Sequence, residues 1–435
     1  GALVAPFTKG PVEDAQLIES EEDLLQTFGQ PYSVDKHYEY WMVASSYLAY
    51  GGTLQVIRAD DYNTLTGVGL KNAFVGTASS IRIKSDTHYN QLGYDDNTIT
   101  GVTIASKTPG TYANGLRVAI IDAKADQVLT VSGISTVGLG ITQSAAGRIV
   151  AGAGGTSVLD GYIKGIVTEV GTGTISVKTL AHVSTAGTVT NVNYQNGGVY
   201  NFATGNISAS AAGTNVGGTA QSVTAAVDWF EQQNIVLTQT DANGNPLKLE
   251  WDALADRPST STYVSSRGGR FDELHVVVID DKGTITGNAG TILEKHLNLS
   301  KAKDAEYSVG STSYWRKYLA TNSQYIYGGS APGITTSAFV SGTATAIGNL
   351  DADSGWDQDG GEVNFGLSGV VTSSLAGGTN YGDKTDYTTS GALTSGVDDL
   401  ITGYGLFENK EEIEVDFILM GAAHHPKEQS QAIAE

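Results

Sequence analysis

The sequence contains no cysteine, which removes disulfide bridges, cysteine-ligated zinc and thiol nucleophiles from consideration. Proline and charged residues are also scarce, with 8 prolines and 16% charged residues in 435 positions. No apolar run approaches the roughly 18 to 20 residues of a transmembrane span. The start of the chain lacks the basic segment and the length of a signal peptide. These absences predict a soluble, unexported chain without membrane insertion.

Basic residues are too few to balance the acidic ones. The formal net charge is −21, the isoelectric point lies near 4.6, and the lysines and arginines are scattered along the chain. A field of this sign repels phosphate backbones and anionic membranes. Direct binding to nucleic acid is therefore not expected.

Glycine is abundant, with 55 copies in the company of threonine, serine, valine and alanine. This mixture is typical of β-structure with many turns. Disorder is the rival interpretation, but 21 tyrosines and 5 tryptophans supply many large side chains for a core. The length and the hydrophobic content predict two or three domains.

The first 60 residues predict an alternation of strands and helices. Strands are expected at residues 3–5, 16–18 and 53–58, and two helices lie between the last two. Ser20 can cap the first helix, whose opening acids face the positive end of the helix dipole, and Gly29 ends it. The second helix spans 36–50. Their expected buried faces are Leu24, Leu25 and Phe28, and then Tyr40, Trp41, Ala44, Tyr47 and Leu48.

From about residue 62 the pattern changes to short alternating segments, such as 81–84 and 116–121, which predict strands. Residues 126–222 carry almost no charge and many glycine and threonine pairs, so they predict an inserted, peripheral β-subdomain. A helix is expected at 225–233. The run 273–280 predicts a strand buried on both faces, followed by a turn at 281–283 and a further strand from Thr284.

A low-complexity stretch covers about 329–398. After it, a helix is expected at 398–407, a buried strand at 414–420, and the opening of a helix at 427–434. The core is therefore expected to be incomplete at its C-terminal end. We predict an α+β, multidomain fold, with an α/β core from 1–61 and 372–435, a β-rich middle domain from 62–125 and 223–371, and the insert 126–222.

Several phrases resemble tail sheath proteins of contractile-tailed, myovirus-type bacteriophages, especially phages of cyanobacteria and enterobacteria. Each phrase is weak alone, and their order over nearly the whole chain is specific. The phrases are Ala2–Pro11, Asp23–Gly29, Ala49–Ala59, Pro109–Val118, Tyr263–Gly269, His275–Val278, Leu293–His296, Ser374–Gly378 and Val415–Met420. Sheath proteins carry N- and C-terminal arms that look absent here, and the insert 126–222 has no clear counterpart in them.

The resemblance implies a structural subunit of the virion, assembled in the host cytoplasm, and not an enzyme. Its copies would form six-fold rings stacked helically around the inner tail tube. Contraction of this stack would drive the tube through the host envelope for genome ejection. The implied partners are further copies of the chain, the tail tube protein, and the baseplate and tail terminator proteins. One folded subunit would then need two alternative sets of contacts with its neighbours.

Two other classes of protein remain as alternatives. A β-rich adhesin or surface-layer protein would suit the glycine-, threonine- and serine-rich middle, but it would need an export signal and repeats, and neither is found. A glycan-degrading enzyme would need a pair of carboxylates in a cleft. No phosphate-binding loop, no dinucleotide fingerprint at 67–69 or 152–154, and no triad spacing is present. We predict no catalytic residue and no cofactor.

Two acidic segments were weighed as calcium loops. Residues 241–245 resemble such a loop, but Pro246 stands where glycine is required, and Asn243-Gly244 is a strong hairpin signal. The second segment misses the spacing of a calcium loop and predicts a solvated acidic loop. It contains Asp351, Asp353, Asp357, Asp359 and Glu362. No metal site is predicted.

His424 and His425 are adjacent, so on an extended chain their side chains point to opposite sides, and a loop is expected there. The five tryptophans are interpreted as core or subunit-interface anchors. They are Trp41, Trp229, Trp251, Trp315 and Trp356. Five polar residues of the most family-like segment either satisfy local hydrogen bonds or face neighbouring subunits, and the sequence leaves both interpretations open. They are Glu273, His275, Glu294, Lys295 and His296.

Overall fold

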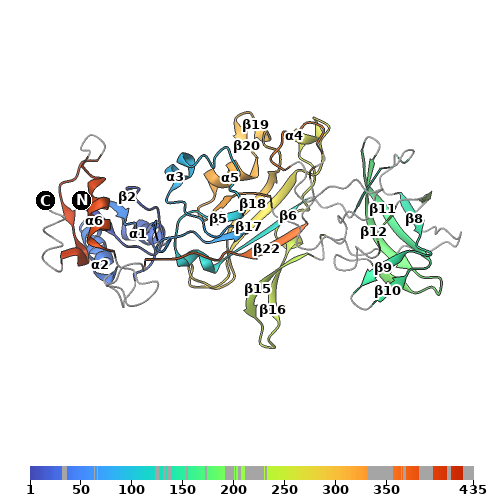
Figure 1. The fold of residues 1–435 in the computed structure, drawn as a ribbon, viewed down its shortest axis with the longest axis horizontal. Helices are drawn as coiled ribbons and strands as arrows, with labels where there is room; N and C mark the ends of the chain where they lie inside the picture. The colour runs from blue at the N-terminus through green and yellow to red at the C-terminus, as the bar shows by residue number, and fades with distance from the viewer. Residues whose placement is uncertain are drawn as a thin grey trace.

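The computed structural model describes most of the chain. It leaves out residues 32–36, 63, 66, 123–126, 131–133, 135–138, 153–154, 172–173, 192–199, 201, 204–206, 211–229, 231–232, 332–355, 364, 366–368, 382–394, 409–412 and 425–435. Helices and many strands in several sheets confirm the α+β, multidomain class. Figure 1 places both ends of the described chain at one end of the long axis and the strands β8, β11 and β12 at the other.

The two ends of the chain build one sheet of four strands, in the order β2-β3-β1-β23. Its strands are β1 (Ala2–Ala5), β2 (Gln16–Ile18), β3 (Leu54–Arg58) and β23 (Ile418–Leu419). The strand β1 pairs in parallel with both β3 and β23. This sheet and its helices, from residues 1–59 and 396–424, are called the terminal unit below. The expected core formed by both ends of the chain is thereby confirmed.

Three helices cover this sheet, namely α1 (Glu21–Phe28), α2 (His37–Ala49) and α6 (Val397–Gly405). The hydroxyl of Ser20 accepts the N–H of Asp23, which confirms the predicted N-cap. Gly29 ends α1 with a φ of +86°, where a side chain would clash with Thr8. The expected face of α2 is confirmed, although Tyr47 is only half-buried.

The prediction that Leu25 belongs to the buried face of α1 is wrong. Leu24 and Phe28 are fully buried, but Leu25 is 39% exposed, because the helix meets the sheet along a narrow i, i+4 line. We expect Leu24→Ala to lower the free energy of unfolding by about 2 to 5 kcal/mol. Leu25→Ala is the matched control and should change it by no more than about 0.5 kcal/mol. Denaturant titration of both variants measures the difference, and equal losses would contradict this packing.

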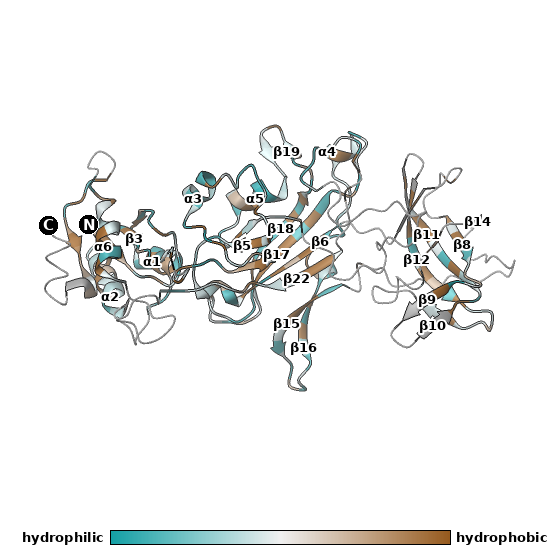
Figure 2. Ribbon diagram, viewed as in Figure 1, coloured by the Kyte–Doolittle hydropathy of each residue, from teal (hydrophilic) through white to brown (hydrophobic). Residues whose placement is uncertain are grey.

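The middle of the molecule is an antiparallel sheet in the order β18-β17-β6-β22. The strands are β6 (Leu116–Asp122), β17 (Glu273–Asp280), β18 (Thr291–Ser300) and β22 (Val370–Ser374). Val276 to Ile279 are buried on alternating faces, which confirms the strand predicted to be covered on both sides. Figure 2 shows the apolar stretches of these strands. The strand β22 crosses the expected boundary at 371/372 and pairs with β6 through Ser374.

Each face of this sheet has its own core. One face packs on Trp315 and Leu319 of α5 (Trp315–Asn322) and on a small sheet, β21-β5-β4. The strands of that sheet are β4 (Phe74–Gly76), β5 (Val102–Ser106) and β21 (Ile326–Gly328). The other face packs on Trp251 and on the base of the hairpin β15 (Asn234–Thr240) and β16 (Pro246–Glu250). The smaller elements here are α3 (Asp86–Gln91), η1 (Thr111–Gly115), η3 (Trp251–Ala253), α4 (Thr262–Ser265), β19 (Glu306–Ser308) and β20 (Ser311–Thr312).

Residues 127–210 hold a separate antiparallel sheet in the order β13-β12-β11-β8-β14, with β7 also on β12. Its strands are β7 (Gln127–Thr130), β8 (Gly140–Ser144), β11 (Tyr162–Gly171), β12 (Thr174–Val183), β13 (Val189–Asn191) and β14 (Ser208–Ser210), beside the hairpin of β9 (Ile149–Gly152) and β10 (Gly155–Val158). Ile163, Val177 and Phe202 lie in a core of its own. We call this sheet the insert.

Two predicted strands in the middle of the chain differ from the structure. Residues 81–84 are in no strand, because the side chain of Asn72 bonds both the N–H and the carbonyl of Ile83 and replaces a strand partner. The strand expected from Thr284 begins at Thr291. The buried carboxylate of Asp280 accepts the N–H groups of Thr284, Ile285 and Thr286 and holds them in a turn.

The closing strand predicted at 414–420 is shorter and more exposed than expected. Only Ile418 and Leu419 pair with β1, at the edge of the sheet, while Phe417 is 64% and Ile418 48% exposed. The helix at 398–407 is confirmed as α6. The predicted helices at 225–233 and 427–434 lie outside the described residues, except for Phe230 and Gln233.

Candidate assembly surface

The two acidic segments hold no metal cluster in the part of the chain that the structure describes, where no three His, Asp or Glu side chains converge. Asp241 accepts the N–H groups of Asn243 and Asn245 at 2.8 Å each, which confirms the plain turn at the tip of β15 and β16. Asp357 is a correction to the solvated loop, because it accepts hydrogen bonds from Tyr314 and Trp315. Asp359 and Glu362 are exposed, and Asp351 and Asp353 lie outside the described residues.

The histidines, glycines and tryptophans considered as site residues in the sequence lie in turns, at strand ends or in the core wherever the structure describes them. His424 ends a short 3-10 turn, η4 (Gly421–His424), which packs on α2, and His425 is not among the described residues. Gly67 and Gly69 lie in a turn, and Gly152 ends β9. Trp41, Trp251, Trp315 and Trp356 are buried core residues, which supports the anchor interpretation for these four, and Trp229 is outside the described part. No helix of the described part has the length and apolarity needed to cross a membrane.

The family-like polar residues satisfy local hydrogen bonds. His275 accepts the N–H of Asn298 at Nδ1 and donates from Nε2 to the carbonyl of Asp256. Burial lowers the pKa of His275, so the ring is neutral near pH 7. These three residues line a polar hollow of about 380 Å³. Both ring nitrogens already have partners, and Asn298 lies where the pairing register of β17 and β18 shifts, so the histidine is placed to hold this irregularity of β18.

Glu294 and His296 form a second local network. Glu294 accepts from His296 at 2.9 Å, from the Ser323 hydroxyl at 2.6 Å and from the N–H of Gln324 at 2.7 Å. Burial alone would raise the pKa of Glu294, but these donors outweigh burial and lower it. Glu273 likewise accepts from Ser259. The local interpretation therefore accounts for these side chains, whereas Lys295 is exposed.

Arg58 joins the terminal unit to the middle of the molecule and is fully buried. Its guanidinium donates to the carbonyl oxygens of Phe7 and Gly10 at 2.9 Å, of Pro109 at 2.6 Å and of Thr8 at 3.4 Å. Phe7 to Gly10 belong to the terminal unit, whereas Pro109 precedes η1. One side chain thus fixes two parts of the chain to each other.

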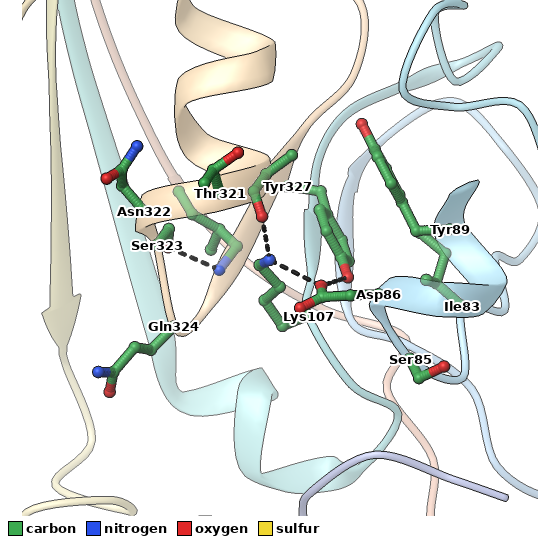
Figure 3. Close-up of polar contacts among 12 residues, drawn as sticks. Ile83, Ser85, Asp86, Tyr89, Lys107, Thr321, Asn322, Ser323, Gln324 and Tyr327 are labelled. Atoms are coloured by element: carbon green, nitrogen blue, oxygen red, sulfur yellow. Dashed lines mark hydrogen bonds and ion pairs between the residues drawn. The ribbon is translucent and has the colours of Figure 1, made fainter. Parts of the chain in front are cut away.

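A second basic residue fastens the elements of the middle. Lys107, after β5, donates to Asp86 at 2.8 Å and to the carbonyl of Ala320 at 2.5 Å, and its Nζ lies 4.2 Å from the centre of the Tyr327 ring. Figure 3 shows it between α3 and the end of α5. Burial lowers the pKa of Lys107, and the bond to Asp86 acts against that shift. Burial raises the pKa of Tyr89, which stacks on Tyr327, to about 12. The cluster is a structural clamp.

Exposed apolar side chains are concentrated on the terminal unit. Half of the large hydrophobic side chains that are exposed among the described residues belong to it. They are Leu17, Leu25, Tyr38, Met42, Val43, Tyr50, Ile401, Leu406, Phe417 and Ile418. Both edge strands of its sheet, β2 and β23, contribute to the set. Open strand edges with apolar side chains are sites where another chain can pair.

Comparisons with solved structures find a weak neighbour. No protein-family model matches the chain, and no curated protein matches it. A solved structure of a sheath tail protein from Listeria innocua aligns with 12% sequence identity and a TM-score of 0.17. The alignment covers 52% of this chain and 31% of that protein, so this chain spans less than a third of its neighbour's length. A TM-score of this size does not establish a shared fold.

Proposed function

We propose that this protein is a structural subunit of a contractile phage tail sheath, which acts as a polymer and has no active site. The observation that carries the proposal is the terminal unit, which has β2 and β23 as the edge strands of its sheet among the described residues and which holds half of their exposed large hydrophobic side chains. A monomer in water gains nothing from such a surface, whereas a second copy would bury it. The sequence phrases that resemble sheath proteins of phages of cyanobacteria and enterobacteria support the same function.

In this proposal, copies form six-fold rings stacked around the inner tail tube and contract to a shorter stack of lower free energy. A strand added to the edge of a neighbour's sheet would stay hydrogen-bonded while the subunits move. The junction at Arg58 and the clamp at Lys107 would let each subunit move as a rigid body. The tail tube, baseplate and terminator proteins would be the other partners, and the net charge of −21 would make lateral contacts sensitive to salt.

Electron microscopy of the concentrated protein tests the proposal. We expect rings or tubes of fixed diameter at some salt concentration. Flat sheets would instead favour a surface-layer protein. A particle that stays monomeric at every salt concentration, by sedimentation as well as by microscopy, would contradict the proposed function.

Two substitutions locate the contact. Phe417→Asp together with Ile418→Asp places charge on the exposed edge of β23 and should abolish assembly, because a buried carboxylate without a partner is strongly unfavourable. Val309→Asp is the control, since Val309 is fully exposed but lies between β19 and β20, away from the terminal unit. Sedimentation velocity compares the two variants. Equal loss of assembly in both would place the contact elsewhere.

A further inference from the structure

Lys301 and Asp122 form a completely buried ion pair. Both side chains have 0% exposure, and Lys301 Nζ lies 2.9 Å from Asp122 Oδ2. Asp122 is the last residue of β6, and Lys301 directly follows β18. The ion pairs of Arg82, Lys84, Lys107, Arg117, His296 and Lys317 all retain some exposed area. A buried pair of this kind loses the hydration of two charges, which its mutual attraction offsets only in part.

The surroundings of the pair supply a further donor and a further acceptor. The N–H of Gly369 donates to Asp122 Oδ1 at 2.7 Å, and Lys301 Nζ donates to the carbonyl of Phe271 at 3.0 Å. The ring of Trp356 lies 5.0 Å from Nζ and packs edge-on against Trp315. The amine and the carboxyl carbon are therefore held together in an aromatic, water-poor setting.

We propose that Lys301 Nζ and Asp122 Cγ condense to an intramolecular isopeptide bond. The ammonium first gives one proton to the carboxylate, which leaves a neutral amine and a neutral acid. The nitrogen lone pair then attacks Cγ, the bond from Cγ to Oδ2 breaks, and that oxygen leaves as water with the acid proton and one amine proton. An ammonium and a carboxylate become an amide and one water, so no other reactant is consumed.

The site favours this step in three ways. Burial lowers the pKa of Lys301 more than Asp122 and Asp272 raise it, which increases the share of nucleophilic amine. The hydrogen bonds of the product are already in place, because Oδ1 keeps the N–H of Gly369 and the amide N–H keeps the carbonyl of Phe271. The amide also removes two buried charges, and a site closed to water resists the reverse hydrolysis.

The bond would join residues 179 positions apart and enclose the whole insert in a covalent loop. Such a loop restricts the unfolded chain, as a disulfide would, and this chain has no cysteine for that purpose. Force applied to the insert would then be borne by a covalent link across β6, β17 and β18. This consequence holds whether or not the protein belongs to a tail sheath.

The mass of the intact, denatured protein tests the proposal. The wild type should be lighter than its sequence by one water. Lys301→Arg should have its full sequence mass, because a guanidinium does not condense here. Asp122→Asn, which can form the same amide with loss of ammonia, should have the same mass as the wild type. A wild-type mass equal to the sequence mass would overturn the proposal. So would a water loss that persists in Lys301→Arg, because succinimide formation at Asp160-Gly161 or Asp359-Gly360 would explain it.

A second experiment keeps both Lys301 and Asp122 unchanged. A protease site placed in the exposed turn at Ala186-Gly187, between β12 and β13, lies inside the proposed loop. After cleavage, the isopeptide bond should keep the two fragments joined on a denaturing gel. A disulfide cannot be the cause, because the chain has no cysteine. Fragments that separate completely would overturn the proposal.

Discussion

Arg58→Met should lower the free energy of unfolding by about 3 to 5 kcal/mol, because three buried carbonyl groups lose the hydrogen bonds that the guanidinium donates. The carbonyl oxygens of Phe7, Gly10 and Pro109 each lose a hydrogen bond of 2.9 Å or less. Methionine matches the aliphatic stem but carries no donor. Denaturant unfolding gives the magnitude. Hydrogen exchange should show the loss of protection first in the residues where the terminal unit joins the middle of the molecule.

Two controls distinguish the loss of the Arg58 hydrogen bonds from the general effect of removing an arginine on stability. Arg58→Lys keeps the charge but not the planar fork, so we expect an intermediate loss. Arg267→Met removes an exposed guanidinium that lies 3.5 Å from the ring centre of Tyr263, and its effect should stay below about 1 kcal/mol. An Arg58→Met variant as stable as Arg267→Met would show that the carbonyl groups find other donors.

Asp280→Ala should have the second largest effect, with a loss of about 3 kcal/mol or more. The carboxylate of Asp280 accepts the N–H groups of Thr284 at 2.9 Å, Ile285 at 2.9 Å and Thr286 at 2.8 Å, and it is fully buried. Alanine removes the acceptor of these three part-buried N–H groups, and a buried group that loses its partner costs about 1 to 3 kcal/mol. Calorimetry or denaturant titration measures the loss.

Asp241→Ala provides the matched control. Asp241 also accepts backbone N–H groups across a turn, from Asn243 and Asn245, but it lies at the exposed tip of the β15 and β16 hairpin. Water replaces the lost bonds there, so the stability should hardly change. Similar losses in both variants would mean that the bonding pattern, rather than burial, decides the cost.

Most of the fold that could be predicted from the sequence lies where local signals are strong. The cap at Ser20, the apolar face of α2 and the buried run of β17 each follow from short-range periodicity, and all three are confirmed. The errors arose where a distant or buried side chain overrides the pattern. Asn72 replaces a strand partner for Ile83, and Asp280 extends a turn past Thr284. A side-chain carboxylate or amide that binds the backbone does not alter the hydrophobic periodicity from which strands are predicted.

The sequence contains no local indication of the apolar surface of the terminal unit or of three of the buried cations. Arg58, Lys107 and Lys301 belong to no basic motif in the sequence, and their partners lie as far as 213 positions away. Leu25 and Phe417 fit apolar stripes that predict burial, yet both are exposed. Exposure of such residues depends on which elements the rest of the chain places beside them.

The sequence by itself determined the absence of thiol chemistry, the strongly acidic balance, the α+β composition and the identity of the main helices and strands, because these follow from residue counts and from periodicity over a few turns. Only the tertiary structure decided the order of the strands in the sheet that the two ends share, which of its described strands lie at the edges, and that Lys301 meets Asp122 with no exposed area on either side chain. Contacts between distant residues depend on chain topology. Local propensity, which a sequence displays directly, carries no information about topology.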